Sequence, residues 1–324
     1  FAQASLTRAG APPRLSAAFA LDQATRLYRS GRLADAVAAE ERARRQVERL
    51  PHAPLLRARL HSIRGAIDVA RGALADGLAA HETAEAILVA ERGEDHPSRV
   101  FELANAANAL LRMGRLDDAE ARLRTARDLH LRSGSQRAEI DAELTNNLAM
   151  VIAQRGDVEA AMVERRGALD RLLEAHGDTH PSVPILRGNL GLDLSRLGRH
   201  DEALAEHRRA LRARELRLGE EHVGNAYSWQ GIGDALAGLS RHAEAVGAYE
   251  RALALRAGPD TDAFEVAESE ASLGRALLAA DPEGDRAVAL LRAAQARLTG
   301  IEQPDAVELR RAVDELLADH STQL

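Results

Sequence analysis

Residues 177–218 read G-D-T-H-P-S-V-P-I-L-R-G-N-L-G-L-D-L-S-R-L-G-R-H-D-E-A-L-A-E-H-R-R-A-L-R-A-R-E-L-R-L, and a related sequence begins again at Gly219. A helical pattern of apolar residues runs up to Leu197, and a second one runs from about Asp201 to Leu218. Gly198, Arg199 and His200 separate the two patterns, as expected of a turn. The stretch therefore predicts a hairpin of two helices.

The hairpin recurs along the chain with a nearly constant spacing. Aligned turns fall at Gly31, Gly72, Gly114, Gly156, Gly198, Ser240 and Gly284, spaced by 41, four times by 42, and finally by 44 residues. The residue five positions after each turn is small: Ala36, Gly77, Ala119, Ala161, Ala203, Ala245 and Ala289. The residue twelve positions after it is Ala43, Ala84, Ala126, Ala168, Ala210, Ala252 and Ala296. Small residues seven apart share one helix face, so a neighbouring helix can cross there closely.

A second signature lies between hairpins. It reads G-E-D-H-P-S at residues 93–98, G-D-T-H-P-S at 177–182 and G-E-E-H-V at 219–223. The glycine can take the left-handed conformation that ends a helix. Asp95 or Thr179, followed by Pro97 or Pro181, is expected to start the next helix. We interpret the signature as a connector.

Composition limits the fold and the partners. Aromatic residues make up only 2% of the chain against 45% hydrophobic residues, so alanine and leucine must build the interior of an all-helical protein. A net charge of −7 provides no basic field for phosphates, which argues against a nucleic-acid partner. The chain has no cysteine and no apolar run near the ~18 residues of a membrane span. A cytoplasmic protein with no membrane partner is expected.

Period and residue types together resemble the tetratricopeptide repeat, and more closely the 42-residue type of kinesin light chains and bacterial multidomain signalling proteins. The resemblance rests on the turn glycines, the paired alanines, the connectors, Trp229, and the small residues Ala107, Ala149, Gly191 and Gly233. It implies an all-α, right-handed superhelical solenoid of about seven hairpins over residues 15–299. Residues 1–14 are interpreted as a linker or the start of a fragment, and residues 303–319 as a C-terminal capping helix.

No catalytic, metal or cofactor site is expected from the sequence. His176 and His180, with Asp178 between them, form the one candidate metal-ligand cluster, and solvated turn residues are the simpler interpretation. Gly231 and Gly233 lack the third glycine and the preceding strand of a nucleotide-binding motif. The chain contains no phosphate-binding loop and no nucleophile motif. A non-enzymatic protein is expected.

Three asparagines form the most informative polar set: Asn105, Asn147 and Asn189, again spaced by 42 residues. Asparagine is a mediocre helix former, so its recurrence at one helical position needs a reason. In the resembling arrays the first helices of the hairpins line a concave groove, and amides in this position are similar to clamps on a peptide backbone. An amide donates and accepts hydrogen bonds, as an extended peptide requires. The alternative is a structural ladder that joins neighbouring first helices.

Neighbouring positions on the same helices extend this candidate groove. Phe101, Ile185 and Tyr227 share one position; Asn108, Met150, Leu192 and Asp234 share another; Arg112, Gln154 and Arg196 share a third. Such a groove would have an apolar floor, amides along it and guanidinium groups at its edge, suited to a segment with apolar anchors and some acidic character. The alternatives are core packing for the aliphatic residues and a solvated surface for the arginines.

These observations predict a scaffold that binds a protein or peptide ligand in its concave groove. Together with the resemblance, they suggest the regulatory or recruiting part of a larger bacterial signalling protein associated with a kinase or a protease. Two alternatives stay open, namely a self-associating structural scaffold and a sensor of small ligands. The identity of the partner and the oligomeric state are not determined by the sequence.

Overall fold

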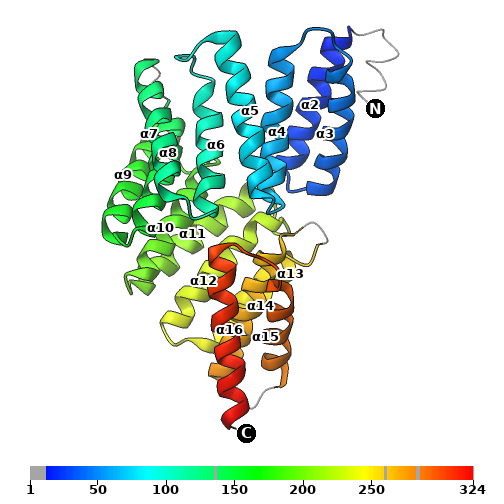
Figure 1. Cartoon of the computed structure of the whole chain (residues 1–324). Coiled ribbons are helices and arrows are strands. Elements are labelled where there is room, and N and C mark those ends of the chain that lie inside the picture. Colours follow the sequence, from blue (N-terminus) through cyan, green and yellow to red (C-terminus); the bar gives the residue numbers. More distant parts are fainter. Residues whose placement is uncertain (1–11, 135–136, 259–260, 282–284, 324) are drawn as a thin grey trace. The chain divides into compact units, whose positions relative to one another are not determined.

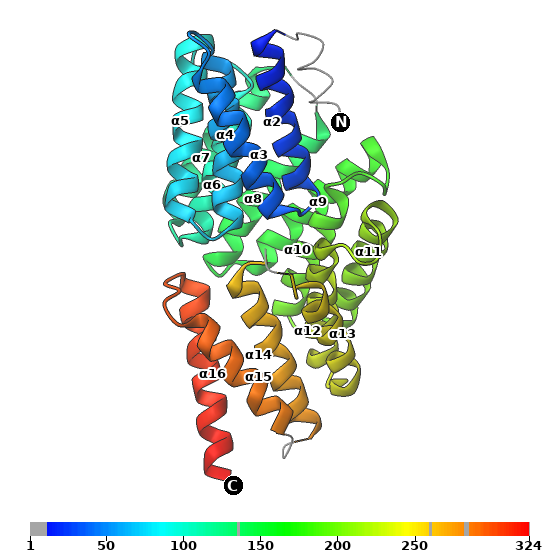
Figure 2. The ribbon, with the colours of Figure 1, turned by 90° about the vertical axis from the view of Figure 1, so that its right-hand side faces the viewer.

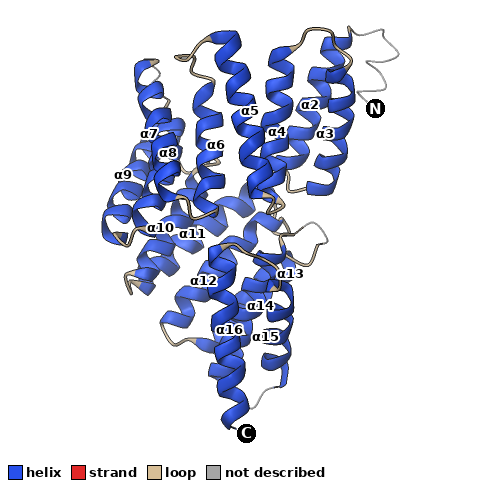
Figure 3. Cartoon of the chain, viewed as in Figure 1, coloured by secondary structure: helices blue, strands red, loops and turns tan. Residues whose placement is uncertain are grey.

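The computed structural model describes residues 12–134, 137–258, 261–281 and 285–323, and these residues form helices and short connections without a strand (Figure 1, Figure 3). The chain divides into two compact units, residues 1–136 and 137–324. The predicted all-α fold of stacked helical hairpins is confirmed. Most of the predicted linker, residues 1–14, lies outside the described residues, and the first described helix begins at Pro13.

Each unit is a series of hairpins in which consecutive helices pack against each other. Unit 1 contains α2 (Pro13–Arg29) with α3 (Leu33–Glu48), α4 (Pro54–Ala70) with α5 (Leu74–Arg92), and α6 (Arg99–Arg112) with α7 (Leu116–Arg132). Unit 2 contains α8 (Ala138–Gln154) with α9 (Val158–His176), α10 (Val183–Arg196) with α11 (His200–Leu218), α12 (Ala226–Gly238) with α13 (His242–Leu255), and α14 (Ala263–Ala280) with α15 (Asp285–Leu298). A short 3-10 helix, η1 (Val223–Asn225), precedes α12.

The last helix, α16 (Pro304–Gln323), covers the end of unit 2, beside α14 and α15 (Figure 2). Its Ala306 and Val313 are buried in a cluster with Ala267, Leu291 and other apolar residues of those two helices. The predicted capping stretch, residues 303–319, falls on this helix. Most residues on its other side are charged, as expected of a helix that closes a solenoid against solvent.

The turns inside the hairpins fall where the sequence places them. Six predicted turn residues have a positive φ: Gly31, Gly72, Gly114, Gly156, Gly198 and Ser240. Ser240, at φ 59°, is the one non-glycine residue in the left-handed region among the described residues. The turn predicted at Gly284 lies outside the described residues.

The predicted alignment of the last hairpin is wrong by two residues. Ala289 and Ala296 are exposed, whereas Ala287 and Ala294 are fully buried. The buried pair lies 42 residues after Ala245 and Ala252, so the second helix of this hairpin keeps the ordinary period. Gly284 misled the alignment because a turn glycine is a weaker constraint than an alanine on which another helix packs.

The connector histidines fold back onto the backbone just before the next helix. Nδ1 of His96 accepts a hydrogen bond from the backbone N–H of Ser98 at 3.2 Å, and Nδ1 of His180 accepts the same bond from Ser182 at 3.2 Å. His222 accepts one from Gly224 at 3.0 Å. α6 begins at Arg99 and α10 at Val183, so each of these bonds fixes the chain immediately before the first helical residue. The connector signature thus has a structural role.

One position in the second helices decides how closely the hairpins pack. It lies four residues after the first buried small residue and is occupied by Glu40, His81, Leu123, Arg165, His207, Tyr249 and Leu291, all buried. Where the side chain is a ring, a glycine of the first helix faces it. A Cβ on Gly65 would lie 2.7 Å from the His81 ring, and a Cβ on Gly191 would lie 2.5 Å from that of His207. A ring at this position of the second helix therefore fits only where the facing residue of the first helix is a glycine.

This packing predicts the effect of Gly191→Ala. The added methyl group would overlap the His207 ring, so we expect the free energy of unfolding to fall by about 1–3 kcal/mol. In a His207→Leu background the same substitution should cost less or stabilise, because alanine is the better helix former by about 1 kcal/mol. Gly247→Ala is the matched control, since its Cβ would meet nothing within 4 Å. Urea unfolding of the four chains and the control measures the coupling, and equal costs in both backgrounds would contradict the packing.

His207 also predicts a pH dependence of stability. Burial lowers its pKa from 6.5 to about 4, with repulsion from Arg214 acting in the same direction, and both ring nitrogens lack a hydrogen-bond partner. The unfolded chain takes up this proton at a higher pH than the folded chain, so stability is full above pH 6.5 and falls toward pH 4. The loss between pH 7 and pH 5 is about 2 kcal/mol. We expect His207→Leu to remove this part of the pH dependence in urea unfolding, and an unchanged pH dependence would refute the assignment.

Candidate functional site

The ten predicted site residues lie on first helices of hairpins in both units. Phe101, Asn105, Asn108 and Arg112 share one face of α6 in unit 1. The other six lie in unit 2, on α8, α10 and α12: Asn147, Gln154, Ile185, Asn189, Arg196 and Tyr227.

In unit 1 the predicted residues form the exposed side of a helix that is otherwise buried. The side chain of Phe101 is 43% exposed, Asn108 is exposed and Asn105 is half-buried. Arg112 instead has a structural contact, because its Nη1 donates a 2.6 Å hydrogen bond to the carbonyl oxygen of Val69 at the end of α4. The face therefore offers an aromatic ring and two amides.

In unit 2 the corresponding sides of α8, α10, α12 and α14 form a surface that we call the first-helix face. It consists of Asn147, Met150, Gln154, Ile185, Leu192, Arg196, Tyr227, Asp234, Glu268 and Arg275. Ile185, Leu192 and Tyr227 are 48%, 42% and 52% exposed. These three side chains are not core residues, which removes the core-packing alternative for Ile185. Hydrogen bonds join α8 to α10 and α12 to α14, and α10 packs against α12.

The first of these connections centres on an asparagine that the sequence did not single out. Asn146 Oδ1 accepts hydrogen bonds from Nδ2 of Asn189 at 2.9 Å and from Nε of Arg165 at 3.0 Å. Asn189 thus joins α10 to α8 through Asn146 and not through Asn147. Asn147 is buried, and its Oδ1 receives a long bond of 3.3 Å from Nδ2 of Asn146. Its own Nδ2 donates to no other described residue.

The buried side chain of Arg165 stabilises the connection between Asn146 and Asn189. It comes from the second helix α9, and its Nη1 donates to the backbone oxygen of Asn189 at 3.1 Å and to the carboxylate of Asp193. Both charged side chains are almost fully buried. Burial lowers the pKa of Arg165 to about 10, and nearby Arg196 contributes repulsion, so the guanidinium stays charged at neutral pH. The signal in the sequence was a lone arginine at a position otherwise filled mostly by leucine or a ring.

A second polar connection joins α12 to α14. Gln230 donates to Ser272 Oγ at 2.9 Å and accepts a bond from Ser269 Oγ at 3.0 Å. The hydroxyl of Tyr227 donates to the carboxylate of Glu265. The guanidinium of Arg256 lies 5.2 Å from the centre of the Tyr227 ring. Tyr227 is therefore held in place while half of its surface stays exposed.

Several carboxylates surround this connection. Asp234 accepts a 2.7 Å hydrogen bond from the hydroxyl of Tyr249 and lines a pocket of about 400 Å³ with Ser272, Arg275 and small residues of α12 and α14. Burial raises the pKa of Glu268 to about 7, against the attraction of Arg256 and with the repulsion of Asp234 and Glu265. This end of the face is thus poor in positive charge.

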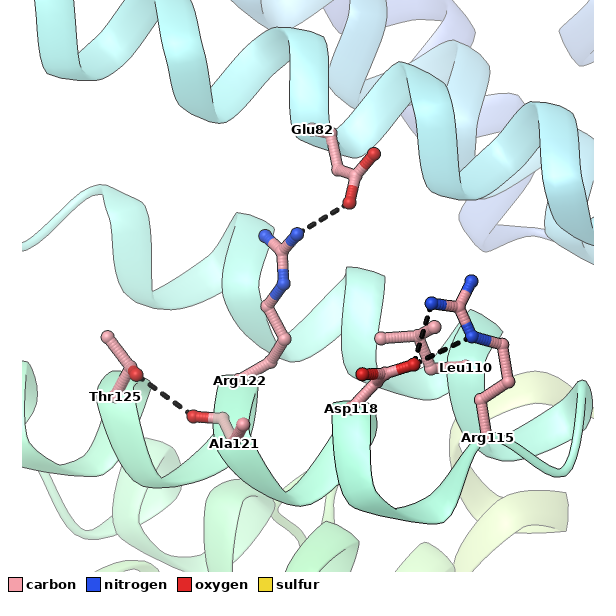
Figure 4. A pocket seen from close by; sticks show the side chains of 7 residues that line it. All are labelled: Glu82, Leu110, Arg115, Asp118, Ala121, Arg122 and Thr125. Carbon is pink, nitrogen blue, oxygen red and sulfur yellow. Dashed lines mark hydrogen bonds and ion pairs between the residues drawn. The ribbon is translucent and has the colours of Figure 1, made fainter.

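A pocket in unit 1 shows no such imbalance of charge. It measures about 290 Å³ and is lined by residues of α5, α6 and α7 (Figure 4). Arg122 pairs with Glu82 at 2.5 Å and with Glu85 at 2.8 Å, and Arg115 pairs with Asp118 at 2.6 Å. All the charged residues around this pocket are therefore paired with one another.

The described residues contain no group of three or more histidine, cysteine, aspartate or glutamate side chains placed to hold a metal ion. His176 and His180 stack with 4.9 Å between ring centres, and His176 Nε2 lies 3.1 Å from Glu139 Oε2. No described helix combines the length and the apolarity that a membrane span needs.

The charged network predicts a strong dependence on Arg165. Arg165→Leu leaves Asp193 buried without its cation, so we expect the free energy of unfolding to fall by about 3–5 kcal/mol. Asp193→Val in the same chain should restore most of the loss, because leucine and valine occupy the equivalent positions at Leu123 and Val151. Chemical denaturation of the single and double variants measures this. If the double variant is as unstable as Arg165→Leu alone, the loss does not come from leaving the Asp193 charge unpaired.

Comparison with known proteins identifies the repeat. Family models described as tetratricopeptide repeat match residues 105–165, 141–216 and 184–257. A search of curated protein sequences found no significant match.

Solved structures share the fold. The Rap conjugation gene regulator of plasmid pLS20, in complex with the Phr* peptide, aligns with a TM-score of 0.63 at 13% identity over 94% of this chain and 96% of that chain. A STAND protein with a tetratricopeptide repeat sensor from Pyrococcus horikoshii aligns at 0.59 and 12%, over 96% of this chain and 48% of its own. A putative kinesin light chain of Podospora anserina aligns at 0.50 and 19%, over 64% and 99%.

The matched models and the shared fold agree with the 42-residue period, the turn glycines and the buried alanines of the described hairpins. Residues 105–257 are therefore identified as tetratricopeptide repeats, and the described hairpins on either side of them have the same helix-turn-helix form.

Proposed function

We propose that the chain binds a peptide, or an extended segment of a partner protein, on the first-helix face of unit 2, and that it catalyses no reaction itself. Asn147 carries the proposal. Its amide nitrogen donates to no other described residue and still reaches the surface, although the residue as a whole is only 7% exposed. An amide N–H that reaches the surface without a protein acceptor can donate to the carbonyl oxygen of a bound segment.

The residues around Asn147 suit such a ligand. Ile185 and Leu192 lie two turns apart on α10 and are both exposed, so they can receive apolar side chains of the bound segment. Arg196, near the end of the same helix, is exposed and forms no ion pair with another described residue. The amide binds the backbone, while the apolar and charged residues select the side chains. Asn105 and Asn108 on α6 give unit 1 a smaller set of the same kind.

The structural neighbours support peptide binding by analogy of fold. Two of the aligned Rap proteins were solved with ligands: one with the Phr* peptide, and the other with Competence and Sporulation Factor, at 14% identity and a TM-score of 0.59 over 95% of this chain and 99% of its own. At such identities the ligand-binding residues cannot be transferred. The proposal therefore rests on the residues of this chain.

We further propose that the array acts inside the cytoplasm as the regulatory or recruiting part of a bacterial signalling protein. The aligned STAND protein is described as a signal-transduction ATPase with a tetratricopeptide repeat sensor, and the present chain aligns with about half of it. An array of this kind converts the binding of a partner into a change of the attached domain. A kinase or a protease would be a suitable attached domain.

Two neighbouring asparagines separate the binding role from the structural role. Peptides selected by the full chain from a displayed random library serve as probes, and their affinity is measured by calorimetry. We expect Asn147→Ala to weaken a selected peptide about fivefold or more, equal to about 1 kcal/mol, with an unchanged unfolding midpoint. Asn146→Ala should lower the midpoint instead, because it leaves Arg165 and Asn189 without their acceptor. If Asn147→Ala lowers the midpoint and leaves the affinity unchanged, Asn147 belongs to the ladder and the proposal fails.

A further inference from the structure

The end of the first-helix face formed by α12 and α14 contains more negative than positive charge. Asp234, Glu265 and Glu268 face two guanidinium groups, those of Arg256 and Arg275. Arg275 acts on Asp234 and on the hydroxyl of Tyr249. Arg256 is therefore the one cation that is left to balance both Glu265 and Glu268.

Arg256 is already committed to other groups. It is 1% exposed, and its Nη1 donates to the backbone oxygen of Glu265 at 2.8 Å and to Ser269 Oγ at 2.7 Å. The same Nη1 lies 3.3 Å from Glu268 Oε2, and Nε lies 3.8 Å from Glu265 Oε2. Neither glutamate receives the short, paired hydrogen bonds that a guanidinium can make with a carboxylate. The cluster is one positive charge short, and Glu268 is the more exposed of the two glutamates that share Arg256.

Glu268 is also accessible to a ligand. Its side chain is 39% exposed, in contrast to the buried Arg256 on its other side. It occupies the position on α14 that Tyr227 holds on α12 and Ile185 on α10. The spacing from Tyr227 to Glu268 is 41 and not 42 residues, because the repeat is one residue shorter before α14. The equivalent packed glycines, Gly233 and Gly274, are also 41 residues apart. A segment that lies across Ile185 and Tyr227 therefore continues to Glu268.

We propose that the bound segment carries an arginine or a lysine that pairs with Glu268, placed next to apolar side chains that contact Ile185, Leu192 and Tyr227. This inference rests on the proposed function and specifies its ligand. The exposed surface of the Tyr227 ring, which also packs near the Arg256 guanidinium, supports the aliphatic stem or the guanidinium of that residue. A metal ion is a poorer occupant, because no group of three ligands is placed for one in the described residues.

The pairing makes binding depend on pH. Desolvation by the surrounding protein raises the pKa of Glu268 to about 7, although 39% of the side chain stays exposed. Arg256 opposes this rise, and Asp234 and Glu265 add to it by repulsion. Below that pH the carboxyl group is protonated and attracts no cation. A bound arginine or lysine stabilises the carboxylate, so binding releases a proton and tightens as the pH rises from 6 to 8.

The test uses a random dodecapeptide library displayed on phage and selected on the full chain at pH 8. We expect enriched peptides with arginine or lysine beside apolar residues. A synthetic copy of an enriched peptide should bind more tightly at pH 8 than at pH 6. Replacing its basic residue by citrulline, which keeps the shape of arginine and removes the charge, should weaken binding about tenfold at pH 8 and abolish the pH dependence.

Glu268→Gln tests the same contact from the protein side. It should reproduce the loss seen with citrulline, and combining the two changes should cost no more than either alone. Glu244→Gln is the matched control, because Glu244 lies on α13, is exposed and pairs with Arg241. It should leave the affinity and its pH dependence unchanged. The citrulline peptide on the unmodified chain keeps the test valid if Glu268→Gln alters folding.

The outcomes separate this inference from the proposed function. Enriched peptides that are acidic, or basic peptides that bind equally well to Glu268→Gln, would overturn the pairing with Glu268. If such peptides still lose affinity with Asn147→Ala, the proposed function stands. A selection that enriches no peptide, or peptides insensitive to both Asn147→Ala and Ile185→Asp, would overturn both proposals.

Discussion

The close approach of a first helix to the second helix of its own hairpin is the constraint on which the rest of the structure depends. It requires a small residue on one helix and a matched side chain on the other, as Gly233 with Tyr249 and Gly191 with His207 illustrate. The small residue commits one side of the first helix to packing. The opposite side is released from the core, and every candidate ligand contact lies there. The function of the array thus follows from the packing of its hairpins.

The same constraint explains why polar side chains occur in the core. Within each hairpin, one buried position of the second helix reaches between two first helices, and in this chain it holds Arg165 and His207 as well as leucines. A buried arginine is tolerated only with a matched anion, which Asp193 supplies from the next hairpin. Arg165 in turn orients Asn146, the neighbour of Asn147. An expensive buried charge is therefore linked directly to the surface that we propose for binding.

The sequence predicted the helices, their turns and most of the buried alanines, because period and side-chain size are visible in one dimension. It failed in α15, where it predicted Ala289 and Ala296 as the packed pair and the buried pair is Ala287 and Ala294. It also gave no role to the connector histidines, whose Nδ1 atoms accept hydrogen bonds from the backbone two residues later. A side chain that folds back on its own backbone leaves no periodic signal.

The candidate site was predicted as a set of positions but not as a set of interactions. The asparagine register was visible from the spacing of 42 residues, yet Asn189 bonds to Asn146, one residue away from the register. Such a shift depends on the crossing of α8 and α10, which no spacing encodes. The shortage of positive charge at Glu268 was hidden for a similar reason, since α12, α13 and α14 each contribute charges that meet only in the fold.

The two kinds of contact on the first-helix face would divide the work of recognition. An amide such as Asn147 binds any peptide backbone, so it contributes affinity without distinguishing one sequence from another. Discrimination then has to come from side chains, and charges at the two ends do this most effectively, because a wrong charge next to Arg196 or Glu268 is repelled as well as unmatched. Opposite charges on α10 and α14 also distinguish the two directions in which a segment can lie across α12. A face of this design would select both the composition and the orientation of its ligand, while the core beneath it stays the same from hairpin to hairpin.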